Sequence, residues 1–595
     1  MSYQAPLNDL RFALHTHAKI AEILTLPVGL GLDDETIDAI LEEAGKFSEQ
    51  ELAPTNRLGD VHGAKIVEGK VVSHESIKAA FEAYRAAGWS GLRAPTDYGG
   101  QGLPSVVSTA CEELFTAANL AFSLMPMLTM GAAEALLNHG SDEIKQTYLP
   151  KMSEGLWSGT MNLTEPQAGS DLAQVATKAE PNDDGSYAIS GQKIFITWGE
   201  HELTENIIHL VLARLPDAPA GVKGISLFVV PKFLVTDSGE VGERNTLEVV
   251  SLEHKMGIHA SPTCVMQFDG AKGYLVGTAN RGLNHMFTMM NHARLGVGVE
   301  GHAIADRAYQ MAVAYAKERV QSRAIDGDSH DAVAIIQHPD VRRLLLTQKA
   351  TIEAQRALIF VAANLLDKAT DHPVASEKEQ SLQTLSFLIP IIKAWCTENA
   401  NVLTNQALQV FGGMGYIEET GIAQLVRDAR ITAIYEGTTG IQALDLVGRK
   451  TAMDQGAAAK VCLAEGVRIA EGLAKAGATD LAQALSHALN LAKESATYVV
   501  MSFAQGQSAA AAAGSVPFLM QMGVTLGAIE MGRAYLASSE ALKDPVAAML
   551  PESFYEEKQQ TVAVYFDHIL VQIETYSRQL LNGSDSILKY NLDSF

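Results

Sequence analysis

The apolar pattern of this chain changes period twice, and those changes constrain its fold more than any single motif. Up to about Leu156, apolar residues recur at helical spacing, beginning with Ile37 and returning over residues 75–88 and 104–138. Short β-branched and aromatic runs follow at 187–197, 207–213 and 225–230, and they continue to about Val276. After Gly282 the helical period returns and holds almost to the end. This order predicts helices, then an antiparallel sheet or small barrel, then helices again.

The length of the chain predicts several structural units. Its 595 residues are too many for one hydrophobic core. We therefore expect an α+β multidomain protein with an N-terminal extension over 1–35, an N-terminal helical domain over 36–158, a central β-domain over 159–278, a C-terminal helical bundle over 279–452 and an additional helical domain over 453–595.

Charge and cysteine usage exclude some classes of function. The formal net charge is −24, from 69 acids against 45 bases, and this surface would repel nucleic acid and anionic lipid. The four cysteines lie far apart and form no CxxC pair, which indicates a cytoplasmic protein without a zinc site. No charge occurs between Ser495 and Ile529, but glutamines, a glycine and a proline interrupt that stretch. We expect buried helices there rather than a membrane span.

Three segments carry chemical motifs. In residues 433–442 a single acid, Glu436, stands between Tyr435 and a Gly-Thr-Thr-Gly turn. Residues 160–172 read Thr-Met-Asn-Leu-Thr-Glu-Pro-Gln-Ala-Gly-Ser-Asp-Leu, and small residues and hydroxyls of this kind let backbone amides approach a ring edge or phosphate closely. Residues 192–199 place Phe195 and Thr197 in a strand-like run. Taken singly, these would be a solvated loop acid, a capped surface turn and a strand with a buried aromatic.

Together, and in this order, the segments resemble the acyl-CoA dehydrogenases, which use FAD, and the resemblance extends over about residues 36–450. The family fold is a helical domain, a β-domain and a helical bundle, to which this chain adds a helical domain. The resemblance implies that Glu436 removes the α-proton of an acyl-CoA thioester while a hydride passes from the β-carbon to flavin N5. The product would be a trans-2-enoyl-CoA, and an electron-transfer flavoprotein would accept the electrons.

The resemblance also assigns binding roles by position. The residues that match FAD contacts are Met161, Leu163, Thr164, Phe195, Thr197, Arg319, Gln409, Gly413 and Thr438. Those that match substrate contacts are Ser170, Arg294, Tyr435 and Gly437. In the family, the positions of Gln409 and Gly413 contact FAD from a neighbouring subunit, which implies a homo-oligomer, either a dimer or a tetramer. Ser322 and Arg323 replace the aromatic-glycine pair that is usual after Gln321, so we assign no FAD contact to Gln321 or Ser322.

Gly296, Gly298 and Gly301 form a literal GxGxxG. A dinucleotide-binding fold needs this motif directly after a strand and at the start of a helix. Residues 283–295 have helical patterning instead, so we expect these glycines to allow close helix packing. For Arg294, just before them, the alternative is a helix-surface arginine paired with an acid.

The sequence does not identify the acyl group of the substrate. The start of the chain and its added helical block resemble a longer bacterial subgroup that acts on 3-(methylthio)propanoyl-CoA or on straight-chain acyl-CoAs, and we favour the methylthio substrate narrowly. Two other classes of function compete: an acyl-CoA oxidase, and a non-enzymatic relative that binds nucleic acid. The charge of −24 and the intact Tyr435, Glu436 and Gly437 disfavour the second. His15 and His17 lack further ligands nearby, so we expect no metal.

Overall fold

A computed structural model describes residues 3–326 and 331–595. Contacts divide the chain into two units, which are described one at a time. Unit 1 consists of Met1–Gly45, Pro104–Ala117 and Val297–Phe595, and unit 2 consists of Lys46–Leu103 and Ala118–Gly296. The five sequence segments remain a prediction, since each unit draws on several of them.

Unit 2 is built on a seven-stranded sheet. Its strands are β3 (Trp157–Asn162), β4 (Lys178–Pro181), β5 (Tyr187–Thr197), β6 (Asn206–Arg214), β7 (Ile225–Pro231), β10 (Leu247–Leu252) and β11 (Thr263–Val276). The pairings β11–β5–β4–β6–β7 return to β11, so the sheet closes on itself as a small barrel, with β10 and β3 added outside the ring. Two pairings, β3 with β6 and β4 with β6, are parallel rather than antiparallel. The predicted barrel is present, but it is mixed, because the long 163–205 segment lets β3 and β6 run in the same direction.

β6 and β7 are buried on both faces, because successive side chains of a strand point to opposite sides. Ile208, Leu210 and Leu212 pack in one core with helices α7 (Leu120–His139) and α8 (Asp142–Ser153). Val211 and Phe228 belong to the second core inside the barrel. The near-continuous apolar sequence of these strands follows from this double burial.

Unit 2 also contains the first part of α9 (Gly282–Glu318) and several short elements. The short elements include α4 (Ala53–His62), the hairpin of β1 (Lys65–Val67) and β2 (Lys70–Val72), α5 (Glu75–Ala86), and the hairpin of β8 (Phe233–Val235) and β9 (Val241–Arg244). The β1–β2 hairpin interrupts a region predicted to be mostly helix. Among the described residues, only α7 is long and apolar enough to cross a membrane, with a mean hydropathy of 1.5. Since 61% of that window is buried and α7 packs against β3, it has the character of a core helix.

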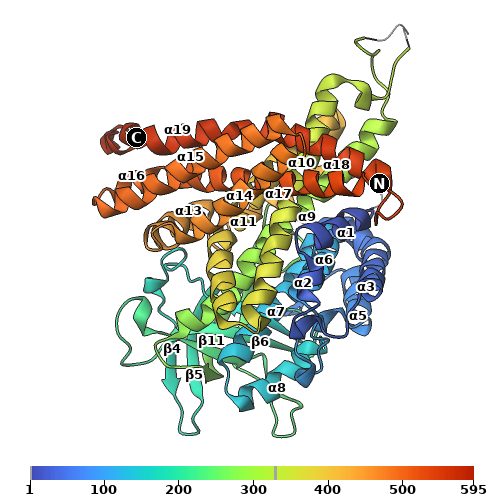
Figure 1. Cartoon of the computed structure of the whole chain (residues 1–595). Coiled ribbons are helices and arrows are strands. Elements are labelled where there is room, and N and C mark those ends of the chain that lie inside the picture. Colours follow the sequence, from blue (N-terminus) through green and yellow to red (C-terminus); the bar gives the residue numbers. More distant parts are fainter. Residues whose placement is uncertain (1–2, 327–330) are drawn as a thin grey trace. The chain divides into compact units, whose positions relative to one another are not determined.

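Unit 1 is helical. It contains α1 (Leu7–Thr16), α2 (Ile20–Ile23), most of α3 (Asp34–Phe47) and α6 (Ser105–Ala118), the later part of α9 (Gly282–Glu318), α10 (Pro339–Asp371), α11 (Ala375–Val410), α12 (Ile422–Thr432), α13 (Thr439–Asp445), α14 (Ala457–Lys475), α15 (Thr479–Ala504), α16 (Ser508–Ala513), α17 (Ser515–Ala541), α18 (Glu552–Val564), α19 (Ile573–Asn582) and α20 (Ser584–Leu588). The long helices α10, α11, α14, α15 and α17 pack side by side (Figure 1).

The uncharged stretch from Ser495 to Ile529 runs through the end of α15, through α16 and into the first half of α17. α17 is buried over most of its length, whereas residues 504–509 are exposed. Gly523 and Gly527 allow this burial, because a Cβ on either would stand 2.4 Å from the Trp395 ring or the Tyr565 hydroxyl. α17 is thus a core helix of unit 1, so the prediction of buried helices holds for this part of the stretch but not for the exposed residues before it.

Candidate active site

Glu436 lies in the turn between α12 and α13. Its φ is 57° and that of Gly437 is 91°, so two consecutive residues adopt the left-handed conformation. This conformation costs a non-glycine residue on the order of 1–3 kcal/mol and persists only where neighbouring groups hold it. Glu436 is half-buried.

Two buried side chains hold the backbone of this turn. The Nε2 of Gln442 donates to the carbonyl oxygen of Glu436 over 2.9 Å. The Nζ of Lys393, on α11, donates to the carbonyl oxygen of Gly437 over 2.8 Å. Both side chains are completely buried, so groups in the interior of unit 1 hold the strained backbone of the turn.

The end of the turn is fixed by two threonines. Thr438 is exposed and caps α13, since its hydroxyl accepts a hydrogen bond from the Ile441 N–H at 3.4 Å. The buried Thr439 hydroxyl donates to Oε1 of Glu398 over 2.5 Å. α13 therefore starts at a defined position directly after Gly437.

Tyr435 connects the turn to α9. Its hydroxyl donates to Oε2 of Glu300, which is 3% exposed. Burial, followed by the charge of Glu436, raises the pKa of Glu300 to about 8. Burial and the neighbouring Glu300 also raise the pKa of Tyr435 well above its usual value, so the phenol keeps its proton.

Two glycines bring α9 against α11. A Cβ on Gly298 would stand 2.6 Å from Cγ2 of Ile392, and one on Gly301 would stand 3.0 Å from the Cys396 backbone. The whole GxGxxG segment lies inside α9. The prediction of close helix packing is confirmed, and Glu300 sits between the two glycines.

Arg319, Gln409 and Gly413, predicted from the family to contact FAD, are all exposed in unit 1. The rings of Tyr315 and Phe411 stack with centroids 4.2 Å apart, which places the ends of α9 and α11 together. A Cβ on Gly413 would meet no atom within 4 Å. This end of the helices therefore offers a guanidinium, an amide and an open backbone on its surface.

In unit 2, a buried ion pair shapes the loop that follows β3. The Nζ of Lys193 donates to Oε1 of Glu165 over 2.7 Å and to the carbonyl oxygen of Leu163 over 3.1 Å. The carbonyl oxygen of Thr164 accepts from the Ile194 N–H at 2.9 Å. The Glu165 carboxylate also accepts hydrogen bonds from Ala176 and Thr177, the shortest at 2.6 Å.

The predicted ligands in this loop differ in exposure. Leu163 is buried, Met161 and Thr164 are half-buried, and Ser170 is exposed. The ion pair beneath them fixes the backbone of Leu163 and Thr164, which is the part of the loop that the family resemblance assigns to the flavin.

Phe195 lies in a β-bulge. The register between β5 and β11 shifts so that Ile194 and Phe195 stand opposite the single residue Val265. Phe195 has a φ of 61° and is 58% exposed, so it is not the buried strand aromatic that was the alternative. Bulges redirect side chains in this way beside functional sites. Thr197, two residues later, is half-buried.

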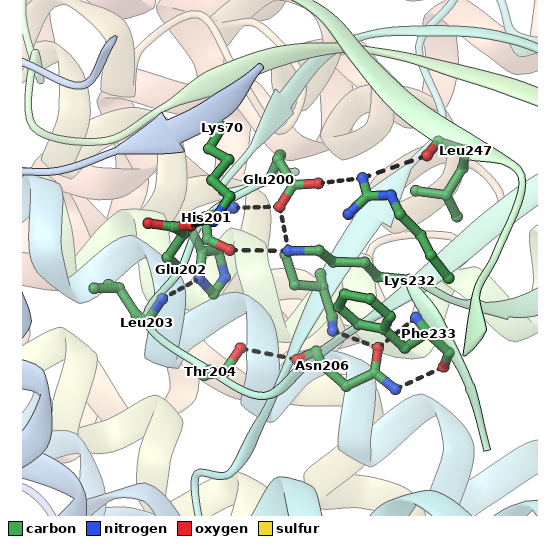
Figure 2. Close-up of polar contacts among 12 residues, drawn as sticks. Lys70, Glu200, His201, Glu202, Leu203, Thr204, Asn206, Lys232, Phe233 and Leu247 are labelled. Atoms are coloured by element: carbon green, nitrogen blue, oxygen red, sulfur yellow. Dashed lines mark hydrogen bonds and ion pairs between the residues drawn. The ribbon is translucent and has the colours of Figure 1, made fainter. Parts of the chain in front are cut away.

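A polar cluster supports the loop that follows Thr197. Glu200 forms an ion pair with Lys232, whose Nζ also donates to the carbonyl oxygen of His201 over 3.1 Å (Figure 2). Arg244 donates to the other oxygen of Glu200 over 3.0 Å. Burial and the charge of Lys232 lower the pKa of His201 to about 3, which keeps this histidine neutral.

Two further candidates from the sequence are Arg294 and the histidine pair His15 and His17. Arg294 is 6% exposed, so it is not the helix-surface arginine that was the alternative. The Nδ1 of His17 pairs with Oε2 of Glu530 at 2.8 Å in unit 1. Among the described residues, no three His, Cys, Asp or Glu side chains are grouped to hold a metal ion.

The sequence does not single out Glu300, Lys193 or Glu165. Glu300 contacts the predicted site residue Tyr435, and Lys193 contacts both Glu165 and the predicted site residue Leu163. Each is a charged residue within an apolar or motif-bearing run, which was the available signal. The two units therefore offer different chemical groups. Unit 1 offers a carboxylate in a rigid turn that can accept a proton, and unit 2 offers an exposed aromatic ring beside an ordered backbone.

Four family models match consecutive parts of the chain. They are described as the N-terminal domain, the middle domain and the C-terminal domain of acyl-CoA dehydrogenase, over residues 34–156, 160–271 and 280–451, and as an acetyl-CoA dehydrogenase C-terminal-like domain over 463–591.

Two curated proteins resemble the chain over nearly its whole length. It is 46% identical to 3-methylmercaptopropionyl-CoA dehydrogenase of Ruegeria pomeroyi over 100% of both chains. It is 34% identical to the broad-specificity linear acyl-CoA dehydrogenase FadE5 of Mycobacterium tuberculosis over 98% of both chains.

The fold also resembles a solved structure. An acyl-CoA dehydrogenase from Bacillus anthracis in complex with FAD superposes with a TM-score of 0.70 at 20% identity. The match covers 96% of this chain and 91% of that one.

Proposed function

The chain belongs to the acyl-CoA dehydrogenase family of FAD-dependent oxidoreductases, and from this premise we propose that Glu436 is the base that removes the α-proton of an acyl-CoA. The observation that carries this assignment is the left-handed turn at Glu436 and Gly437, held by Gln442 and Lys393. A carboxylate on a backbone that buried side chains hold in a strained conformation is suited to point at one substrate atom.

The α-proton of a thioester is weakly acidic, so its removal needs a well-placed base and stabilisation of the developing oxyanion. Glu436 can serve as the well-placed base, because its carboxylate is half-buried and a hydrogen bond from Gln442 holds its backbone. By family resemblance, the backbone N–H of Glu436 is one of the donors that stabilise the developing oxyanion. Tyr435 and Gly437 flank this carboxylate and, with Ser170 and Arg294, are the proposed substrate contacts.

The chemistry of the predicted cofactor contacts, some exposed and others half-buried or buried, fits FAD. We assign its contacts to Met161, Leu163, Thr164, Phe195, Thr197, Arg319, Gln409, Gly413 and Thr438. Phe195 offers an aromatic face, Arg319 offers planar donors suited to a pyrophosphate, and Gly413 leaves its backbone open to a ligand. When bound, FAD supplies the acceptor for the β-hydride.

For the acyl group, we favour 3-(methylthio)propanoyl-CoA. The 46% identity to the Ruegeria pomeroyi enzyme over the full length supports this choice. A straight-chain acyl-CoA is the second candidate, supported by the 34% identity to FadE5.

The same proposal includes a homo-oligomer and an electron-transfer flavoprotein as electron acceptor. Exposure of Gln409 and Gly413 leaves them accessible to a neighbouring subunit's cofactor. The four cysteines are free and buried, which supports the cytoplasmic location.

The test is anaerobic addition of acyl-CoAs to the purified flavoprotein, from methylthiopropanoyl through butanoyl to palmitoyl. Prompt bleaching of the flavin absorbance is expected, and the fastest chain identifies the substrate class. Glu436→Gln, with its flavin content matched to that of the parent, should slow bleaching by at least about 100-fold. A fully loaded protein that no acyl-CoA bleaches would refute the proposal.

Admitting air after bleaching tests the electron acceptor. A dehydrogenase should reoxidise slowly until an electron-transfer flavoprotein is added. Reoxidation by oxygen at the rate of turnover would identify an oxidase instead.

A further inference from the structure

Two carboxylates interact electrostatically at the turn that carries the proposed base. Glu436 is in the turn itself, and Glu300 reaches it from α9 through the Tyr435 hydroxyl. The charge of Glu436 acts directly on Glu300. Two neighbouring carboxylates resist carrying negative charge together, so one of them tends to keep a proton.

The surroundings of Glu300 disfavour its charged form. The side chain is 3% exposed, and Oε1 is buried without a hydrogen-bond partner in the described parts of the chain. An ionised carboxylate with a bare oxygen in a dry interior is costly. Glu436, in contrast, is half-buried and retains contact with solvent.

One cation offsets part of this cost. Lys393 lies within electrostatic reach of Glu300 and favours its charged form. Its Nζ, however, donates to the carbonyl oxygen of Gly437. The charged and titratable groups that act on Glu300 are Tyr435 and Lys393, which favour its charged form, and Glu436, which opposes it. Burial is the largest effect, and the balance raises the pKa of Glu300 to about 8.

We propose that Glu300 is a positioning residue that keeps a proton beside the catalytic turn and holds that turn through Tyr435, so that Glu436 alone carries the charge a base requires. The role as an aid to the base rests on the proposed function. The proton on Glu300 is retained through turnover, and no bond to substrate forms or breaks there. The difference in burial decides which of the two carboxylates is the base.

Infrared spectroscopy of the intact flavoprotein tests the retained proton without using activity. The difference spectrum between the parent protein and Glu300→Gln at pH 7 should contain the C=O stretching band of a protonated carboxyl. That band should disappear as the pH passes about 8. A difference spectrum without the band at pH 7 overturns the proposal, whether or not Glu436 is the base.

Tyr435→Phe provides a second variant that leaves the Glu300 carboxyl in place. The band should remain but shift in frequency, because the phenol no longer donates to Oε2. An unchanged frequency would contradict the assigned contact. If Glu300→Gln fails to fold, the spectrum of Tyr435→Phe still shows whether Glu300 is protonated.

The pH profile of flavin bleaching tests the link to the base. If Glu300 is already neutral, Glu300→Gln should leave the midpoint of the acidic limb, which reports Glu436, in place. If Glu300 were charged, removing that charge would lower the midpoint by ~1 unit or more, and the proposal would be wrong. Failure of any acyl-CoA to bleach the parent protein would instead count against the proposed function.

Discussion

The Nζ of Lys193 stands 2.7 Å from Oε1 of Glu165, and the two side chains are 0% and 3% exposed. Burial acts against the charge of both groups, but Lys193 and the hydrogen bonds to Thr177 and Ala176 hold the pKa of Glu165 below its usual value. The pair lies behind Leu163 and Thr164, so the backbone proposed to face the flavin is fixed by an interaction buried beneath it.

Replacing Lys193 by Met should destabilise unit 2 by about 3–5 kcal/mol, because Glu165 would remain as a buried charge without its cation. Thermal unfolding measures the loss, and flavin fluorescence reports FAD release as the loop loosens. Lys272→Met is the matched control: Lys272 pairs with Asp184 at the same 2.7 Å, but in an exposed setting, and its loss should change little. Equal effects of the two variants would contradict the role given to burial.

Replacing Phe195 should change stability and FAD affinity in opposite directions. Phe195→Gly should stabilise unit 2 by about 1 kcal/mol, since glycine adopts a positive φ without the cost borne by phenylalanine, and the ring is 58% exposed. Loss of the aromatic face should weaken FAD binding roughly fivefold. Melting temperature and fluorescence titration measure the two effects, and Phe195→Tyr is the control that keeps the ring. A lower melting temperature for Phe195→Gly would show that the ring is packed.

The sequence predicts the order of helical and strand segments and the packing role of Gly298 and Gly301, because these depend on local periodicity. It does not predict the supports of the site. Lys193 and Glu165 are 28 residues apart, and Tyr435 and Glu300 are 135 apart. Which residues pair at such separations depends on the tertiary structure. A single charged residue in an apolar segment indicates that a partner exists, but it does not identify that partner. The bulge at Phe195 likewise depends on its register with β11.

The close packing of α9 on α11 predicts the effect of a single methyl group. Gly298→Ala would place a Cβ 2.6 Å from the buried Ile392, forcing the helices apart at a cost of about 1–3 kcal/mol. Glu300 and its contact with Tyr435 would move as well, so the rate of flavin bleaching should fall. Gly448→Ala is the control, since the nearest atom there is 3.9 Å away. Similar melting temperatures and rates for both variants would contradict the packing argument.

The contacts of Glu530 with Arg533 and His17 predict a pH dependence for unit 1. Burial favours the neutral form of Glu530, but Arg533 and then His17 lower its pKa from 4.5 to about 2. A carboxyl whose pKa is lower in the folded state stabilises that state above its unfolded pKa, and loses this contribution as the pH falls from about 4.5 towards 2. The contribution is on the order of 3 kcal/mol.

Glu530→Gln should therefore lower the melting temperature at pH 7, and the gap between variant and parent should narrow as the pH falls towards 3. The reason is that below pH 4.5 the unfolded parent takes up a proton on Glu530 while the folded parent still resists protonation, whereas glutamine binds no proton in either state. Glu574→Gln is the control, because Glu574 pairs with His487 on the surface, where both side chains are more than half exposed. Solvent and salt weaken such a pair, so its removal should leave the melting temperature nearly constant at both pH values. A gap for Glu530→Gln that stays the same from pH 7 to pH 3 would mean that packing around Glu530, rather than its charge, stabilises α17 in unit 1.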